Sequence, residues 1–149
     1  MNHEEKNEGH EGHEGGLRPL RLQSPLPSET ERVMTATIGC AISVHRALGP
    51  GFLESIYLAA MGIEMRARSL AAERERAIYV SYRGVDIPGQ RVDLLVERVV
   101  VVELKAVRRF EDVHYAQVVS YLKTLGLRAG LLINFNVPLL RQGLKRIVL

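Results

Sequence analysis

The sequence has a single cysteine and no long apolar run, and both absences narrow the kind of protein that it can encode. Cys40 is the only cysteine in 149 residues, so neither an intramolecular disulfide nor a zinc site made of cysteines can form. No stretch of about 18 continuous apolar residues occurs, and the N-terminus lacks a basic segment followed by an apolar one. These absences predict a soluble, cytoplasmic protein without a membrane span.

The first 16 residues also lack what a folded core requires. They contain no aliphatic side chain after Met1 and repeat the triplet Glu-Gly-His. We therefore expect residues 1–27 to form a disordered His/Glu/Gly-rich tail and a proline-containing connector. Residues 28–149 then form one domain, which is long enough to bury a core without disulfides.

The acidic tail lowers the net charge of the whole chain, and the remaining chain is more basic than the total suggests. Residues 1–16 hold five Glu and one Lys, so residues 17–149 carry 19 basic and 12 acidic side chains, a net charge of +7. A basic domain of this size suggests an anionic partner, of which nucleic acid is the most common.

Apolar spacing predicts two helices at the start of the domain. Ser28 and Glu31 offer a capping box for the first helix. Its apolar face continues to Leu48, and Gly49-Pro50-Gly51 ends it. The second helix, Leu53 to Arg68, has one apolar stripe. That stripe consists of Leu53, Ile56, Ala60, Ile63 and Ala67.

The rest of the chain alternates between strand and helix patterns. Alternating apolar residues predict a strand from Ala77 to the Arg83-Gly84 turn, and the next two strands form a hairpin around Glu97-Arg98. Further elements follow: strands 91–96 and 99–104, a helix capped by Asp112 that runs to Leu125, a strand at 130–135, and a helical turn from Pro138 followed by a strand-like end. This order predicts an α/β fold with a mixed central sheet flanked by helices.

Charged residues converge in the predicted hairpin. Glu103 and Lys105 are two apart on one strand, so their side chains leave the same face of the sheet. With a two-residue turn, the numbers of facing residues sum to about 195, which places Asp93 near Glu103. Two carboxylates and an ammonium group are therefore expected to meet.

Such a cluster suits a hard divalent cation. Mg²⁺ is typically held by one or two carboxylates together with water and substrate phosphate. Surface strands often alternate apolar and charged residues, so the motif taken alone fits a solvated strand as well. Val99 to Val102 is continuously apolar, however, as in a strand covered on both faces, where a Glu and a Lys are costly to leave unpaired.

One segment resembles a known family. Residues 51–57, Gly-Phe-Leu-Glu-Ser-Ile-Tyr, resemble the signature of the GxxExxY proteins, a branch of the PD-(D/E)XK nuclease superfamily. The resemblance runs from about Glu29 to Leu149. It includes residues 44–51, Val-His-Arg-Ala-Leu-Gly-Pro-Gly, and residues 134–138, Asn-Phe-Asn-Val-Pro.

The resemblance implies a restriction-endonuclease-like αβββαβ core and assigns roles within it. Asp93 is the motif Asp, Glu103-Leu104-Lys105 is the (D/E)XK motif, and Glu54 is an additional acid from the N-terminal helix. Gln117 and Tyr121 match the Gln-X-X-X-Tyr of the RecB-like branch, and their spacing places both on one helical face. In this assignment Glu54, Asp93 and Glu103 hold Mg²⁺ or Mn²⁺, and Lys105 completes the catalytic set.

Four further residues are candidates for substrate binding, and for most of them a purely structural role is the alternative. Tyr57 either contacts substrate or packs in the core with a hydroxyl hydrogen bond. His114 lies on or beside the Gln117 face. Arg108 and Arg109 follow the Glu103 strand, where they bind a backbone phosphate or are simply solvated.

The leading hypothesis from the sequence is a metal-dependent nuclease that hydrolyses DNA phosphodiester bonds. The alternative is a non-catalytic nucleic-acid-binding or assembly module with the same fold. RNA or a nucleotide as the substrate is a third hypothesis, because an acidic site acts on the phosphate and not on the base. A short chain without a second domain also leaves a partner protein or a homo-oligomer open.

Overall fold

The computed structural model describes residues 26–149, so the expected tail and connector lie outside the described residues except for Leu26 and Pro27. Its elements confirm the predicted order. They are α1 (Ser28–Leu48), α2 (Glu54–Ala67), β1 (Ala72–Tyr82), β2 (Val85–Val96), β3 (Val100–Lys105), α3 (Asp112–Leu125), β4 (Ala129–Asn134), the 3-10 helix η1 (Leu140–Gly143) and β5 (Leu144–Val148).

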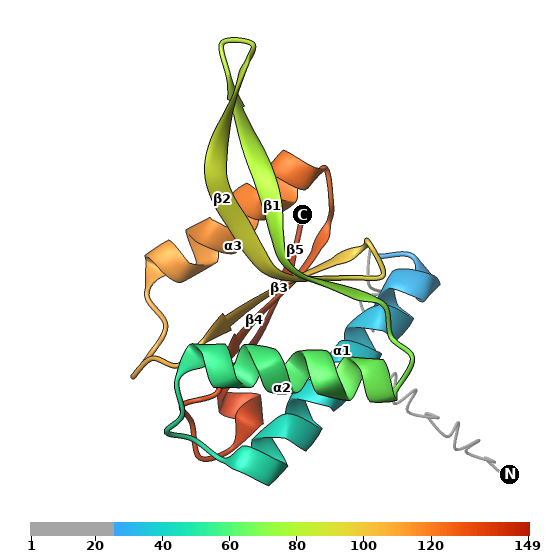
Figure 1. Ribbon diagram of the computed structural model, residues 1–149, viewed down its shortest axis with the longest axis vertical. Coiled ribbons are helices and arrows are strands. Elements are labelled where there is room, and N and C mark those ends of the chain that lie inside the picture. Colours follow the sequence, from blue (N-terminus) through green and yellow to red (C-terminus); the bar gives the residue numbers. More distant parts are fainter. Residues whose placement is uncertain (1–25) are drawn as a thin grey trace, which may run out of the picture.

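The strands form one mixed sheet in the order β1-β2-β3-β4-β5. Neighbouring strands are antiparallel except β3 and β4, which are parallel because α3 carries the chain back between them. Helices α1 and α2 pack with one set of buried sheet residues and α3 packs with another, so the sheet has helices on both faces (Figure 1). The α/β architecture is therefore as expected.

The start of α1 differs from the prediction in its capping. Ser28 is already helical, Pro27 precedes it as the N-cap, and no side-chain cap is formed. The side chain of Glu31 instead accepts hydrogen bonds of 2.9 and 2.7 Å from the guanidinium of Arg146 on β5. The capping-box prediction was wrong because the helix starts one residue earlier than expected, so Glu31 is one position past N3 and binds Arg146 instead.

The apolar stripe predicted for α2 was also wrong. Leu53 and Ile63 are 75% and 68% exposed. The helix instead packs through Tyr57, Leu58, Met61 and Met65. Both sets have helical spacing, so periodicity alone could not decide between them.

Strands β1 and β2 extend well beyond the body of the protein. They begin at Ala72 and Val85, earlier in the chain than the predicted Ala77 and Arg91. They are joined by a turn in which Arg83 and Gly84 have φ of 50° and 79°. Beyond an irregularity in the pairing after Ile78, residues 79–87 form a free hairpin that we call the arm (Figure 1).

The β2–β3 turn is longer than the predicted two residues. Val96 pairs with Val100, so Val99 belongs to the turn together with Glu97 and Arg98. The paired numbers therefore sum to 196 instead of about 195. Continuing this register by one position places Asp93 directly opposite Glu103, and not only near it as predicted.

Helix α3 also has a different cap from the predicted one. Asp112 is its first residue, and Glu111 is the N-cap in a reciprocal capping box with His114. Gly126 ends the helix in the left-handed conformation, as expected. Among residues 26–149, no helix has both the length and the apolar character needed to cross a membrane.

Candidate metal centre

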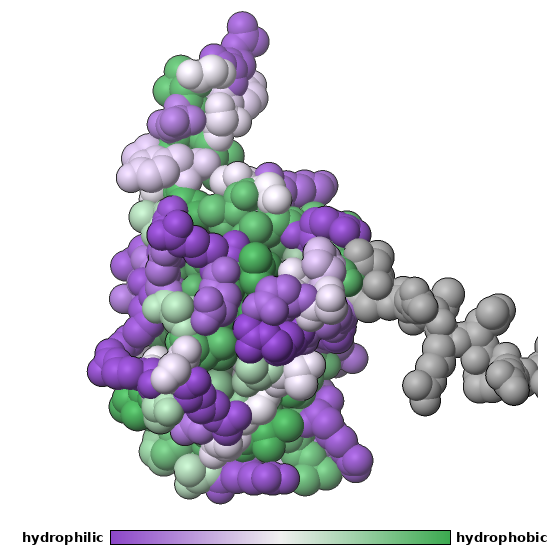
Figure 2. Space-filling view, turned by 90° about the vertical axis from the view of Figure 1, so that its right-hand side faces the viewer, coloured by the Kyte–Doolittle hydropathy of each residue, from purple (hydrophilic) through white to green (hydrophobic). Residues whose placement is uncertain are grey.

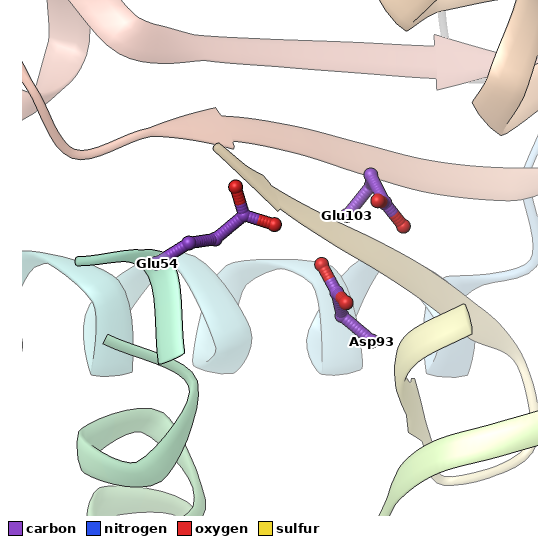
Figure 3. A group of neighbouring side chains, drawn as sticks. All are labelled: Glu54, Asp93 and Glu103. Atoms are coloured by element: carbon purple, nitrogen blue, oxygen red, sulfur yellow. The ribbon is translucent and has the colours of Figure 1, made fainter. Parts of the chain in front are cut away.

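Three acidic side chains from three elements meet beside the sheet. Glu54 stands at the start of α2, Asp93 lies on β2 and Glu103 lies on β3. Each offers a carboxylate oxygen, and these oxygens all lie within 4.8 Å of one another. Figure 3 shows the three carboxylates directed toward a common point. Oxygen ligands in this arrangement are those that Mg²⁺ or Mn²⁺ prefers.

Glu103 is the most buried member of this acidic cluster. Only 4% of the residue is exposed, because β3 is covered by neighbours on both faces. Its Oε1 lies 3.3 Å from Nζ of Lys105. Its Oε2 is buried and has no hydrogen-bond partner among the described residues. A buried, unpartnered carboxylate oxygen is costly, and a bound cation would satisfy it.

The environment disfavours negative charge on all three acids. Burial, reinforced by the charge of Asp93, raises the pKa of Glu103 to about 8, although Lys105 acts in the opposite direction. Burial likewise raises the pKa values of Asp93 and Glu54 above their usual range. A cation in the cluster would reverse this balance, because it stabilises the ionised form of each carboxyl group.

The backbone holds Asp93 in place. Its Oδ2 accepts a hydrogen bond of 2.8 Å from the backbone N–H of Leu104 on the adjacent strand. This bond joins β2 to β3 at the position where Glu103 and Lys105 leave the sheet. The geometry therefore confirms that two carboxylates and an ammonium group converge, as the hairpin register predicted.

Tyr57 supports the segment before Glu54. It is fully buried and stacks on Phe135 with ring centroids 4.4 Å apart. Its hydroxyl donates to the carbonyl of Gly49 at 2.5 Å and accepts from the N–H of Phe52 at 3.2 Å. These contacts support the structural alternative for Tyr57, and its substrate contact stays a prediction.

Gln117 and Tyr121 lie on α3, and Tyr121 packs with Val101, which shares a face of β3 with Glu103. Burial and the charge of Glu103 raise the pKa of Tyr121 to about 12, while a hydrogen bond with Gln117 lowers it. The Tyr121 hydroxyl also accepts a hydrogen bond of 3.3 Å from Nε2 of Gln90. Gln90 was missed in the sequence because nothing local links β2 to α3. Tyr121 is almost fully buried, so Gln117 is the more accessible of the predicted pair.

The segment after β3 brings the other basic candidates together. Arg108 and Arg109 are exposed, and with Val107, Glu111 and His114 they line a hollow of about 540 Å³. Nδ1 of His114 accepts a hydrogen bond of 3.0 Å from the N–H of Glu111, so this histidine caps α3. The hollow leaves both arginines available to an anion.

Asn134, part of the segment 134–138 quoted for the family resemblance, has a structural role that the sequence did not assign to it. It is buried at the end of β4, and its Oδ1 accepts hydrogen bonds of 3.1 Å from the N–H groups of Val107 and Asn136. Its Nδ2 donates to the carbonyl of Val107 at 2.8 Å. Asn134 therefore fixes the segment that leads from Lys105 to the two arginines.

Comparison with protein families gives a match. A family model described as the PD-(D/E)XK nuclease superfamily matches residues 31–147. This span contains the acidic cluster and Lys105. No curated protein and no solved structure matches the chain significantly.

Proposed function

Because the chain belongs to the PD-(D/E)XK nuclease superfamily, we propose that it is a metal-dependent nuclease that hydrolyses phosphodiester bonds of DNA. Members of this superfamily are typically nucleases that use divalent metals. The observation that carries the proposal is the convergence of Glu54, Asp93 and Glu103 within 4.8 Å, beside an unpartnered oxygen. We assign the nuclease-like domain to residues 28–149.

The donor set fits Mg²⁺ or Mn²⁺, which we propose as the cofactor held by the three acids. When bound, such a cation polarises the scissile phosphate and lowers the pKa of a coordinated water. Asp93 stays oriented by the Leu104 N–H, and Glu103 supplies the oxygen that lacks a partner among residues 26–149.

We assign Lys105 to the attacking water. Its ammonium lies 3.3 Å from Glu103 and is mostly buried, so its position is restricted. From there it can orient the water and offset negative charge as five oxygens gather around phosphorus. Gln117, Arg108 and Arg109 are proposed contacts to the nucleic-acid backbone. The Gln117–Tyr121 spacing and the residue 51–57 motif favour placement in the GxxExxY and RecB-like branches.

The test combines metal binding with cleavage. Mg²⁺ and Mn²⁺ are titrated by calorimetry into the wild type and into the double variant Asp93→Ala/Glu103→Ala. We expect a binding signal for the wild type and none for the double variant. Cleavage of linear DNA, circular DNA and RNA should fall at least about 1,000-fold, because metal catalysis contributes several kcal/mol and each 1.4 kcal/mol is tenfold. Asp86→Ala, on the same strand but outside the cluster, is the matched control.

Each outcome separates the hypotheses. Cleavage of RNA but not DNA would retain the nuclease and replace its substrate. Metal binding without cleavage of any of the three nucleic acids would contradict catalysis and favour the non-catalytic module. An absence of metal binding in the wild type would refute the metal centre itself.

A further inference from the structure

The arm exposes apolar side chains that the rest of the fold does not cover. Ile78 is buried in the cluster under α3, but two residues further along β1 Val80 is already 44% exposed. The large exposed side chains of the arm are Tyr79, Val80, Tyr82, Val85 and Ile87. In Figure 2 the arm stands clear of the body and shows apolar surface among polar groups.

The pairing register sorts these side chains onto two faces. Val80 pairs with Ile87 and Tyr82 pairs with Val85, so these four share one face. Ser81 pairs with Asp86 and lies on the opposite face. Alternation from Ile78 places the four-residue face on the same side of the sheet as α3. We call it the apolar arm face.

A two-stranded hairpin is at best marginally stable when it stands alone in water. The apolar arm face has no core behind it, and the Pro88-Gly89 segment beside the pairing irregularity separates it from the packed part of the sheet. An exposed cluster of large apolar side chains on such an element indicates an interaction surface.

The four side chains of this face favour an apolar partner over a nucleic-acid groove, although the turn between them carries the exposed Arg83. None of its four side chains is basic, although phosphate contacts dominate nucleic-acid binding. Arg76 near the base of the hairpin is paired with Glu73, and Arg91 lies 4.0 Å from Glu75. Asp86 on the opposite face would repel phosphates. A partner with its own apolar surface fits better.

We propose that the apolar arm face packs against the same face of a second copy of this chain. A two-fold axis brings identical surfaces together, and a face made only of Val, Ile and Tyr side chains is complementary to itself. The exposed parts of these four side chains amount to roughly 400 Å² per copy, since a tyrosine side chain alone accounts for up to about 250 Å².

The surface area that the dimer would bury indicates its expected affinity. About 800 Å² in total lies at the low end for specific interfaces, where association is weak or transient. We therefore expect a dissociation constant on the order of 10 to 100 µM. Strand β2 carries Asp93 and also forms one side of the arm. The dimer would therefore contain two acidic clusters.

Sedimentation equilibrium of the full chain from about 1 to 300 µM tests the proposal without reference to catalysis. The wild type should shift from monomer to dimer over this range. Val85→Glu places a charge on the apolar arm face and should weaken association at least tenfold. Ser81→Glu adds the same charge to the opposite face, and Ile63→Glu adds it to the exposed face of α2; both should leave association unchanged. Circular dichroism checks that all variants fold.

Three results would overturn the proposal. The first is a wild type that stays monomeric up to 300 µM. The second is equal weakening by Val85→Glu and Ser81→Glu, which would show that association does not use the apolar arm face. The third is a monomeric wild type whose affinity for a short DNA duplex is lost in Val85→Glu, which would make nucleic acid the occupant.

Discussion

Both ends of the β1–β2 hairpin depart from the usual pattern of buried apolar and exposed charged side chains: the base buries acidic groups and the tip exposes apolar ones. At its base, β2 passes between packed helices and carries Asp93 beside the buried carboxyl of Glu103. At its tip, Tyr82 and Val85 are exposed to solvent. Buried charges and exposed apolar clusters both cost free energy unless something else binds them. The comparison therefore indicates a ligand at each end: a cation at the base and a protein surface at the tip.

A second contrast lies within the buried region. Glu103 has an oxygen without a partner in the described part of the chain, whereas Asn134 and Tyr57 have polar groups that are hydrogen-bonded. Removing a satisfied buried group destabilises a protein, whereas neutralising Glu103 removes a charge that burial disfavours, at the cost of its contact with Lys105. The following predictions use this difference, from the largest expected effect to the smallest.

The largest effect is expected for Glu103→Gln in metal-free protein. Because folding raises the pKa of Glu103 from 4.5 to about 8, its folded form binds more protons between these values. The stability that this group contributes is fully present below about pH 4.5 and is lost as the pH rises toward 8. At pH 8 the substitution should raise the free energy of unfolding by roughly 2 to 4 kcal/mol.

Urea unfolding at pH 5 and pH 8 with a chelator measures this effect. The gain from Glu103→Gln should shrink at pH 5, and excess Mg²⁺ should stabilise the wild type more than the variant. A variant that is less stable than the wild type at pH 8 without metal would show that Glu103 is adequately paired inside the protein.

Asn134→Ala should have an effect of opposite sign and smaller size. It leaves the N–H and carbonyl of Val107 without their buried partner, which should lower the free energy of unfolding by about 2 kcal/mol. Asn136→Ala is the control, because Asn136 is exposed and its side chain donates only a 3.4 Å hydrogen bond to the same carbonyl. Similar losses in both variants would argue against a special role for the buried amide.

The smallest effect is expected for Tyr57→Phe. Loss of the hydroxyl bonds to Gly49 and Phe52 should lower the free energy of unfolding by about 1 kcal/mol. If the role of Tyr57 is structural, as its burial indicates, the KM for the proposed nucleic-acid substrate should stay unchanged. Tyr82→Phe removes an exposed hydroxyl and should change stability by less than about 0.5 kcal/mol. A raised KM with unchanged stability in Tyr57→Phe would restore the substrate contact predicted from the sequence.

The sequence by itself determined most of the element order and the proximity of Asp93, Glu103 and Lys105. Helix periodicity, strand alternation and glycine turns are local properties, so they located α1, α3 and β4 closely. Two residues on one strand share a face whatever the rest of the chain does. Glu54 joined the acidic cluster only through the family resemblance, because no local rule brings the start of α2 to β3.

Only the tertiary structure decided which surfaces are covered. Periodicity marked an apolar stripe on α2, but the packed face is the one with Tyr57 and Met61. Alternation marked a half-buried strand at Val80 and Tyr82, yet α3 does not extend over them. The roles of Asn134 and Gln90 depend on partners distant in the chain. Burial is a property of the neighbours that long-range packing brings, and short sequence patterns do not contain those neighbours.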